Sequence, residues 1–309
     1  QPDYLAGHSL GELTTAHLAG VFTLEDAARL VAARAQLMAT LPAGAMTSLT
    51  TSEETARRLL EGHEHAVSIA AANSPTNTVL AGDPDHLAAI EQQAQDLGIR
   101  CRRLTVSAAF HSPHTETILD AFHQIAATVT YQPPSIPLVS TLTGQPADPD
   151  HITTPGYWAD QIRHAVRFAD AVTTLNQQGV ATYLELGPDA TLTTLARQTL
   201  AEAEPSGAAG VTATQRRGRP EADALREALA ELHVAGVNVD WTAGAAAEAT
   251  PARVPAPVDL PTYPFQRRRY WLAAPVESGD PAAFGLRSSE HAVISAVVEL
   301  ADVSVHDPV

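Results

Sequence analysis

A short glycine-rich motif near the start of the chain constrains the local fold more than any other feature. The residues are Gly7-His8-Ser9-Leu10-Gly11, a G-x-S-x-G pattern. Its glycines allow the sharp turn between a strand and a helix that leaves a serine hydroxyl projecting at the helix N-terminus. There the helix dipole and the Leu10 N–H group can stabilise a developing oxyanion. The pattern predicts that Ser9 is a nucleophile. A turn serine that only caps a helix is the alternative.

Residues 24–38 predict a helix that carries an arginine on its apolar face. Arg34 follows Leu30 by four residues and precedes Met38 by four, whereas Arg29 lies on the polar face. A guanidinium directed into a protein needs an anion, because its charge is permanent. An internal salt bridge or a snorkelling side chain would satisfy it. The functional alternative is a bidentate clamp for a substrate carboxylate or phosphate. A serine nucleophile with a buried arginine suggests an acyl group that carries a free carboxylate.

A nucleophilic serine needs a base, and His111 has the most suitable context among 13 histidines. It follows a strand expected to end near Val106 and directly precedes residues 112–113, a Ser-Pro pair typical of a helix start. His114, inside that helix start, is the competing candidate. No aspartate stands out between the serine and His111, which disfavours the order of an α/β-hydrolase triad. A dyad whose imidazole is oriented by a backbone carbonyl remains open.

The length of 309 residues suggests about two domains. Residues 44–106 predict the order βαββαβ, the split βαβ pattern. After residue 206 the chain changes to a basic loop and one helix, and residues 242–257 and 273–287 are predicted to be linkers. The final apolar run, 292–301, predicts a strand with nothing to pair with. We therefore expect a further domain to begin there.

Composition excludes several classes of function. Arginine and lysine number 19 against 35 acidic residues, so the net charge of −16 disfavours binding to nucleic acid through phosphates. Cys101 is the single cysteine, which rules out an internal disulfide and suits a reducing cytosol. No apolar run approaches the roughly 18 residues of a membrane helix, and no signal segment opens the chain. We expect a cytoplasmic protein without nucleic-acid or membrane partners.

Several ordered motifs together resemble the acyltransferase domain of a modular type I polyketide synthase. The matching stretches are GHSLGE at 7–12, RAQLM at 34–38, AFHSPH at 109–114 and LELGP at 184–188. Downstream, VDW at 239–241 and LPTYPFQRRRYW at 260–271 resemble the linker that follows such a domain. EH at 290–291 and VVELAD at 297–302 are similar to the opening of a dehydratase domain.

The resemblance implies an α/β fold with a hydrolase-like acyltransferase core over residues 1–205. Residues 44–106 would form an inserted ferredoxin-like βαββαβ subdomain. Residues 206–287 would be the post-acyltransferase linker, and residues 288–309 the start of a dehydratase (hot-dog) domain. The family's domain begins upstream with a Gly-Gln-Gly segment whose glutamine helps to form the oxyanion hole. This sequence lacks that segment, so we expect a fragment of a multienzyme with impaired activity.

The resemblance also implies roles for individual residues. Ser9 would be the acylated nucleophile, His111 its base, and the Leu10 N–H group an oxyanion donor. Arg34 would bind the malonyl carboxylate. Gln161 would supply the backbone carbonyl that orients the histidine.

The choice of acyl group follows from the same resemblance. Malonyl-type members have an aliphatic residue after the serine and a His-Ala-Phe-His motif, and Leu10 with Ala109 and Phe110 matches this type. Ala108 departs from the first histidine of that motif. Phe110 is expected to fill the space that a 2-methyl branch would need. A methyl group is worth only about 1–3 kcal/mol by pocket fit, so the preference need not be absolute.

The expected reaction transfers a malonyl unit from malonyl-CoA to the phosphopantetheine thiol of an acyl carrier protein through an acyl-serine. The domain itself would bind no cofactor. Ketosynthase and dehydratase domains would be its neighbours in the same chain, and the parent synthase would be a homodimer that makes an antibiotic-type polyketide. The alternatives are a serine esterase or thioesterase on a related core and a catalytically inert fragment of the synthase.

Overall fold

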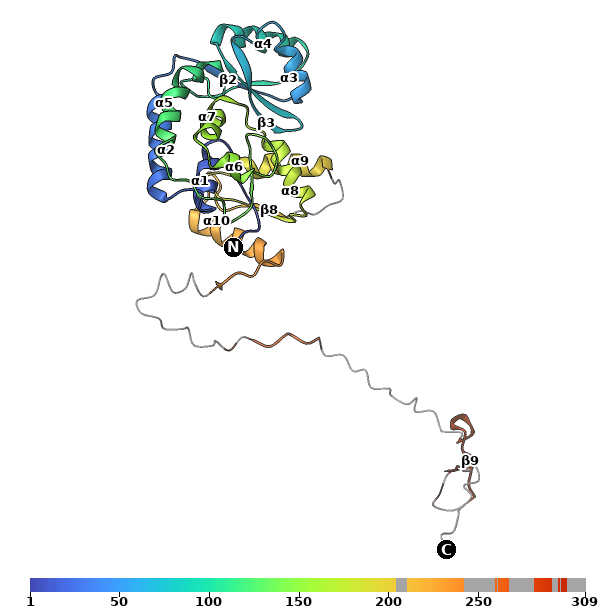
Figure 1. The fold of residues 1–309 in the computed structure, drawn as a ribbon. Coiled ribbons are helices and arrows are strands. Elements are labelled where there is room, and N and C mark those ends of the chain that lie inside the picture. The colour runs from blue at the N-terminus through green and yellow to red at the C-terminus, as the bar shows by residue number, and fades with distance from the viewer. Residues whose placement is uncertain are drawn as a thin grey trace. The chain divides into compact units, whose positions relative to one another are not determined.

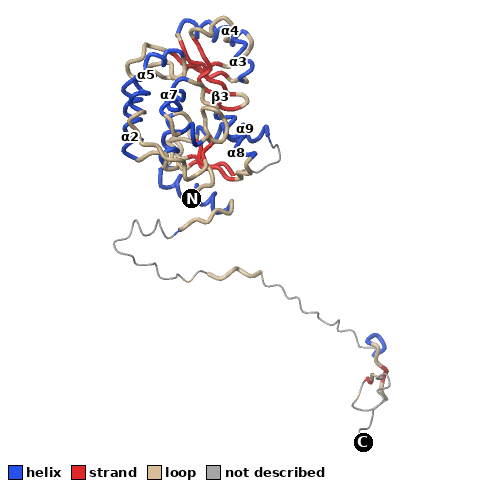
Figure 2. The backbone as a smooth tube through the Cα atoms, in the orientation of Figure 1, coloured by secondary structure: helices blue, strands red, loops and turns tan. Residues whose placement is uncertain are grey.

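The computed structural model describes residues 1–203, 210–241, 259, 261–266, 281–290, 294 and 296–298. The chain divides into one unit over residues 1–247 and a second over residues 248–309, and each is described by itself. Figure 1 shows the ribbon of the chain, and Figure 2 separates its helices, strands and loops.

Residues 44–106 form a four-stranded antiparallel sheet with two helices. The elements are β2 (Ala45–Leu49), α3 (Glu53–Leu59), β3 (Val67–Ser74), β4 (Asn77–Gly82), α4 (Pro84–Asp96) and β5 (Cys101–Arg103). The strand order is β3-β4-β2-β5, and every neighbouring pair is antiparallel. This order confirms the predicted βαββαβ subdomain. Its last strand ends before the expected position near Val106, because only residues 101–103 pair with β2.

Local signals in the sequence explain both helices of this subdomain. The Asp83 carboxylate accepts hydrogen bonds from the first turn of α4, and Pro84 occupies its first position. Leu87 and Ile90 of α4 are fully buried against Leu49 and Leu80 of the sheet. The helical spacing of apolar residues therefore places α4 on one face of the sheet, where Figure 1 shows it beside α3.

The rest of the first unit consists mainly of helices around two short parallel strand pairs. Its elements are β1 (Leu5–Ala6), α1 (Leu10–Leu18), α2 (Leu24–Met38), η1 (Pro113–Thr115), α5 (Glu116–Ala126), β6 (Leu138–Val139), α6 (Pro149–Ile152), α7 (Pro155–Arg163), α8 (Phe168–Gln177), β7 (Thr182–Glu185), α9 (Thr191–Ala203), β8 (Gly210–Ala213) and α10 (Glu221–Val234). β1 pairs with β6, and β7 pairs with β8. The main core joins α1, α2, α5 and α7 through side chains such as Leu13, Leu30, Phe122 and Trp158.

One loop of this helical part joins the small sheet. Val166, between α7 and α8, forms a parallel bridge with Ala71 of β3. Its N–H group donates to the Ala70 carbonyl and its own carbonyl accepts from Ala72, each at 2.9 Å. The loop that follows α7 is thus held against the edge of the subdomain sheet.

The compact first unit extends beyond the expected acyltransferase boundary at residue 205. β8 and α10 were assigned by sequence to the linker, but both belong to the first unit. β8 pairs in register with β7 from Thr182↔Gly210 to Glu185↔Ala213, and α10 buries Ala224, Ala228 and Leu232. Strand pairing and apolar burial therefore extend the compact unit through residues that composition alone suggested were connecting chain.

In the second unit the described elements are η2 (Pro281–Phe284), β9 (Arg287–Ser288) and β10 (Ala296–Val297). β9 and β10 pair antiparallel, so part of the apolar run at 292–301 does find a partner. The predicted linker 242–257 and half of the LPTYPFQRRRYW stretch lie outside the described residues, and the dehydratase assignment stays a prediction. None of the described helices combines the length and the apolar character needed to cross a membrane.

Candidate active site

Ser9 lies on a tight turn between β1 and α1. Its backbone angles are φ 52° and ψ −110°, a conformation that non-glycine residues adopt only when their surroundings hold them there. The turn brings residue 7 so close to the first turn of α1 that a Cβ on Gly7 would lie 2.2 Å from the Gly11 carbonyl oxygen. The strand, sharp turn and helix expected around a nucleophilic serine are therefore present.

The two glycines of the motif differ in what surrounds them, which gives a first test. A Cβ on Gly7 would overlap backbone, whereas a Cβ on Gly11 meets nothing within 4 Å. We expect Gly7→Ala to lower the free energy of unfolding by about 1–3 kcal/mol or more, and Gly11→Ala by less than about 1 kcal/mol. Urea denaturation of both variants measures the difference. Equal stability of the two would contradict the close packing described here.

The hydroxyl of Ser9 is paired with His111 across 102 residues of sequence. The distance from Ser9 Oγ to His111 Nε2 is 2.7 Å. On the far side of the ring, Nδ1 lies 2.8 Å from the carbonyl oxygen of His164. A carbonyl can only accept, so Nδ1 carries the proton, and Nε2 of the neutral ring is free to accept the proton of Ser9. His114, the competing candidate, has no such contact with Ser9: its buried Nδ1 lacks a hydrogen-bond partner among the described residues.

The carbonyl at hydrogen-bond distance from His111 Nδ1 is that of His164, while the Gln161 backbone acts on the ring more weakly and its orienting role stays a prediction. The hydrogen bond to His111 Nδ1 comes from His164, three residues further along, just after α7 ends. Gln161 instead lies inside α7 and acts through its side chain: Nε2 donates to the Ser9 carbonyl at 2.7 Å. Both residues lie at the C-terminal end of α7, where the last carbonyls have no partner within the helix and can accept from a side chain.

His111 is held in its neutral form. Burial and, second, the neighbouring Arg34 charge lower its pKa to about 3, whereas the hydrogen bond to the His164 carbonyl opposes the shift. The side chain is only 4% exposed. An imidazole that is unprotonated at neutral pH is ready to accept a proton from Ser9.

Arg34 reaches the same hydroxyl from α2. Its Nη2 donates to Ser9 Oγ at 3.0 Å, and the residue is only 4% exposed. Two further guanidinium nitrogens, Nε and Nη1, are buried without a hydrogen-bond partner among the described residues. Burial lowers the pKa of Arg34 to about 10, and attraction to Glu12 opposes the shift. The described residues contain no carboxylate in salt-bridge contact with this guanidinium. It can therefore pair with an anion that is bound next to Ser9.

The residues expected to control acyl-group choice lie around the dyad. Leu10 begins α1 and is 48% exposed, so its side chain is accessible and its N–H group lies at the helix N-terminus. Ala109 is fully buried. It lies so close to Gly44 that a Cβ added to Gly44 would be 2.5 Å from the Ala109 nitrogen. Phe110, next to His111, packs against a buried apolar cluster that includes Ala71, Phe168 and Leu195.

A buried polar network beneath the Ser9 turn was missed by the sequence analysis. Glu12 is 2% exposed and accepts from the Tyr157 hydroxyl at 2.5 Å and from the Thr141 N–H group at 2.9 Å. The Thr141 hydroxyl lies 2.7 Å from the Gly7 carbonyl. Burial raises the pKa of Glu12. In the sequence, the signal for this network is a carboxylate, that of Glu12, between apolar positions of a helix and next to Leu13.

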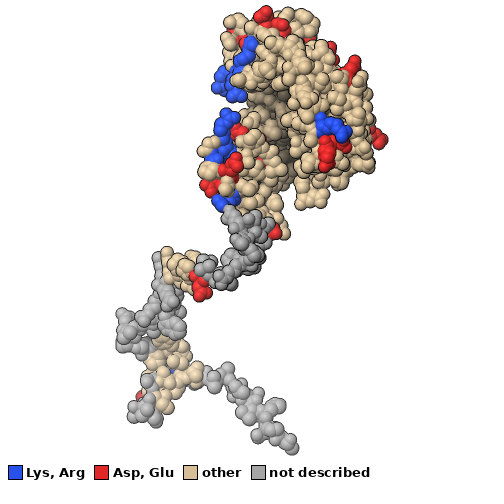
Figure 3. Space-filling view, turned by 90° about the vertical axis from the view of Figure 1, so that its left-hand side faces the viewer, with Lys and Arg blue, Asp and Glu red and all other residues tan. Residues whose placement is uncertain are grey.

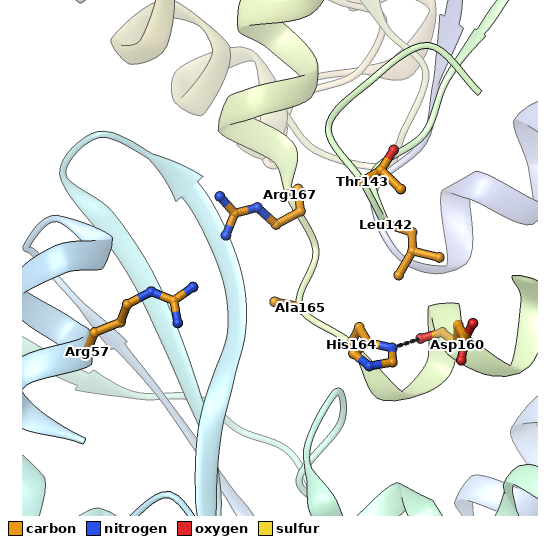
Figure 4. Close-up of a pocket in the computed structure, with 7 residues that line it drawn as sticks. All are labelled: Arg57, Leu142, Thr143, Asp160, His164, Ala165 and Arg167. Atoms are coloured by element: carbon orange, nitrogen blue, oxygen red, sulfur yellow. Dashed lines mark hydrogen bonds between the residues drawn. The ribbon is translucent and has the colours of Figure 1, made fainter. Parts of the chain in front are cut away.

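An open cavity of about 420 Å³ lies on the other side of the His164 loop. Its walls come from both parts of the unit: they include Arg57 from α3 and Arg167 from the loop before α8, with Ala165 nearby (Figure 4). Both arginines pair with Glu53, at 2.5 and 2.6 Å, so neither is an unpaired cation. Figure 3 shows that basic side chains on one face of the molecule lie in separate patches among acidic ones.

The strained turn and the serine–histidine pair give this α/β chain an arrangement typical of proteins with a serine nucleophile. Comparison with known proteins then identifies its family. Residues 1–239 match the acyl transferase domain family. The chain is 45% identical over 304 residues to polyketide synthase GfsA of Streptomyces halstedii, which covers 97% of this chain and 4% of the synthase. It is 42% identical over 301 residues to the mycoketide-CoA synthase of Mycobacterium tuberculosis, which covers 97% of this chain and 7% of that protein.

Solved structures agree with this result. The acyltransferase domain from the second module of the salinomycin polyketide synthase has a TM-score of 0.74 at 42% identity and covers 86% of this chain and 60% of that chain. The acyltransferase domain of SpnD, in complex with 2-(pent-4-yn-1-yl)malonyl, has a TM-score of 0.71 at 37% identity, covering 76% and 57%. The chain belongs to the acyl transferase domain family, of the type found in modular polyketide synthases.

Proposed function

We propose that the chain transfers a malonyl group from malonyl-CoA to the phosphopantetheine thiol of an acyl carrier protein. The observation that carries the proposal is the buried Arg34 guanidinium, which donates to Ser9 Oγ and has two nitrogens without a hydrogen-bond partner among the described residues. A carboxylate on the acyl group would supply the missing anion through charge-assisted hydrogen bonds. Acetyl groups lack that carboxylate and would be selected against. The malonyl-type ligand of the SpnD domain belongs to the same chemical class.

The first half-reaction acylates Ser9. His111 Nε2 accepts the hydroxyl proton while Oγ forms a bond to the thioester carbon of malonyl-CoA. The Leu10 N–H group, at the N-terminus of α1, would donate to the resulting oxyanion. When the C–S bond breaks, His111 returns its proton to the CoA thiolate. The products are a malonyl-serine ester and free CoA.

The second half-reaction reverses these roles. The phosphopantetheine thiol loses its proton to His111 Nε2 and attacks the ester carbon. The Ser9 Oγ bond to the acyl group then breaks, and His111 gives the proton back to Oγ. Neither step consumes a proton or an electron overall, and the reaction needs no cofactor beyond the two thiol carriers. The carrier protein and the neighbouring synthase domains are partners under the same proposal.

We also propose that malonyl is preferred over methylmalonyl. Leu10 is accessible beside Ser9, and Phe110 packs next to His111. Both positions are bulky and apolar, which restricts space for a branch at the acyl C2 atom. The discrimination expected from one methyl group is about 1–3 kcal/mol.

Intact-protein mass spectrometry tests the proposal directly. The chain is incubated with equal concentrations of malonyl-CoA and methylmalonyl-CoA, with the Ser9→Ala variant as control. We expect a malonyl adduct that exceeds the methylmalonyl adduct by about 10-fold or more and is absent from the variant. A predominant methylmalonyl adduct would keep the acyl transfer and overturn the roles of Leu10 and Phe110. A folded chain that forms neither adduct would contradict the proposed function.

A further inference from the structure

Both members of the Ser9–His111 pair are held from the same end of helix α7. The Gln161 carboxamide donates to the backbone carbonyl of Ser9 at 2.7 Å, and the His164 carbonyl accepts from His111 Nδ1 at 2.8 Å. These two residues are separated by less than one helical turn. Sequence places Ser9 and His111 102 residues apart, yet one short segment contacts both.

The carbonyl that Gln161 binds belongs to the strained residue. Ser9 has φ 52° and ψ −110°, so the direction of its side chain depends on contacts that keep the backbone in this conformation. Its carbonyl accepts from the Glu12 N–H group at 3.0 Å within the first turn of α1. The Gln161 side chain is the contact that fixes this carbonyl from outside α1.

The Gln161 side chain is itself fixed. It is 3% exposed, and its Nε2 faces two acceptors, the Ser9 carbonyl and the Glu12 carboxylate at 3.3 Å. Because both neighbours on this side of the carboxamide are acceptors, its nitrogen and not its oxygen must face them. The orientation of the carboxamide therefore follows from its neighbours. Glu12 is anchored in turn by Tyr157 and Thr141.

The loop that carries the His164 carbonyl is equally constrained. Val166 is paired with β3 on both sides, and the Arg167 N–H group donates to the Thr141 carbonyl at 2.6 Å. Thr141 also contacts Gly7 and Glu12, so the loop and the Ser9 turn share one anchor. A displacement of the α7 end would therefore change the geometry of the nucleophile and the base together.

We propose that the Gln161 carboxamide is a positioning residue: it holds the Ser9 backbone so that Oγ stays within hydrogen-bond distance of His111 Nε2. This inference rests on the proposed acyl transfer at Ser9. Gln161 touches neither the reacting atoms nor the acyl group in this arrangement. Its loss should therefore slow acylation without changing the affinity for the acyl-CoA.

The test compares Gln161→Met with Thr174→Val. Met has a similar volume but cannot donate, and Thr174 is a buried residue of α8 whose hydroxyl donates to the Gly144 carbonyl at 2.6 Å, away from Ser9. We expect Gln161→Met to lower the rate of Ser9 acylation at saturating malonyl-CoA by about 10- to 100-fold, with KM within about twofold of wild type. Thr174→Val should lose a similar few degrees of Tm and keep its acylation rate. Equal acylation rates in the two variants at matched stability would overturn the proposal.

A fluorophosphonate that labels serine nucleophiles separates this inference from the proposed function. If wild type is labelled at Ser9 but forms no malonyl adduct, the proposed function fails. If both reagents modify wild type and Gln161→Met reacts with each at the wild-type rate, the positioning role fails. A parallel loss with both reagents supports it, because the nucleophile itself is then misplaced.

A second variant, Gln161→Glu, adds a pH readout. The new carboxyl would face Glu12, with Tyr157 on the same network and Arg34 and His111 across the turn. It can donate to the Ser9 carbonyl only when protonated, so the acylation rate relative to wild type should rise as the pH falls from 8 to 5. A constant ratio across this range would indicate a structural role and contradict the proposal.

Discussion

Replacing His111 with alanine is expected to lower the rate of Ser9 acylation by about 10²- to 10⁴-fold. The wild-type imidazole has its Nε2 2.7 Å from Ser9 Oγ and its Nδ1 proton held by the His164 carbonyl, so the tautomer is already correct for proton acceptance. Rapid-quench mass spectrometry of the acyl-enzyme measures the rate. The variant His233→Ala, in α10, is the control and should acylate at the wild-type rate.

The pH dependence follows from the same residue. Because burial lowers the pKa of His111 to about 3, the wild-type acylation rate should stay constant from pH 8 to pH 5 instead of falling near 6.5. Stability should behave differently. His111 binds a proton near pH 6.5 in the unfolded chain and only near pH 3 in the folded chain. Its contribution to the free energy of unfolding is therefore complete above pH 6.5 and is lost as the pH falls toward 3. Urea denaturation at pH 7, 5 and 4 should show this decline, and a smaller one in His111→Ala. An acid limb of acylation near 6.5 would contradict the buried neutral base.

Replacing Arg34 with methionine is expected to remove the preference for carboxylated acyl groups. Acylation by malonyl-CoA should fall by about 10²- to 10³-fold, because a buried carboxylate would lose its charged partner. Acylation by acetyl-CoA should change far less, so the ratio of the two rates is the measured quantity. Arg29→Met is a matched control on the same helix. Arg29 is 51% exposed and forms an ion pair with Asp26 at 3.2 Å, a type of contact that is worth little. A wild-type malonyl preference in Arg34→Met would disprove the clamp.

Arg34→Met has a second expected effect. The Arg34 charge is the second-largest cause of the low pKa of His111, after burial. Removing it should raise the pKa of His111 toward its ordinary value, although burial will keep it below 6.5. The acid limb of the acylation profile should therefore move to higher pH in this variant and remain in place in Arg29→Met. An unshifted profile would show that the two side chains are not electrostatically coupled.

Much of the site could be predicted from the sequence because each signal is local. The glycine pattern around Ser9, the apolar spacing around Arg34 and the Ser-Pro helix start after His111 each involve only a few neighbouring residues. The structure brings these three side chains together at 2.7 and 3.0 Å. The subdomain at 44–106 was predicted for the same reason: each strand and helix has its own periodicity, and short connections leave few topologies.

The contacts that position the site could not be predicted in this way. Which carbonyl faces His111 depends on where α7 ends, and a shift of three residues separates Gln161 from His164. The compact unit extends past residue 205 because β8 pairs with β7 along four residues. Strand pairing over such distances is a tertiary property and leaves a weak signal in composition.

The sequence by itself determined the chemistry: a serine on a sharp turn, a histidine at a helix start and an arginine on an apolar helix face. It also determined the βαββαβ subdomain. Only the tertiary structure decided how these groups are held. The strained Ser9 backbone, the neutral His111 and the buried Arg34 depend on burial and on contacts from α7, Thr141 and Glu12. Burial and long-range hydrogen bonds arise only when distant segments pack together, and local residue patterns do not specify them.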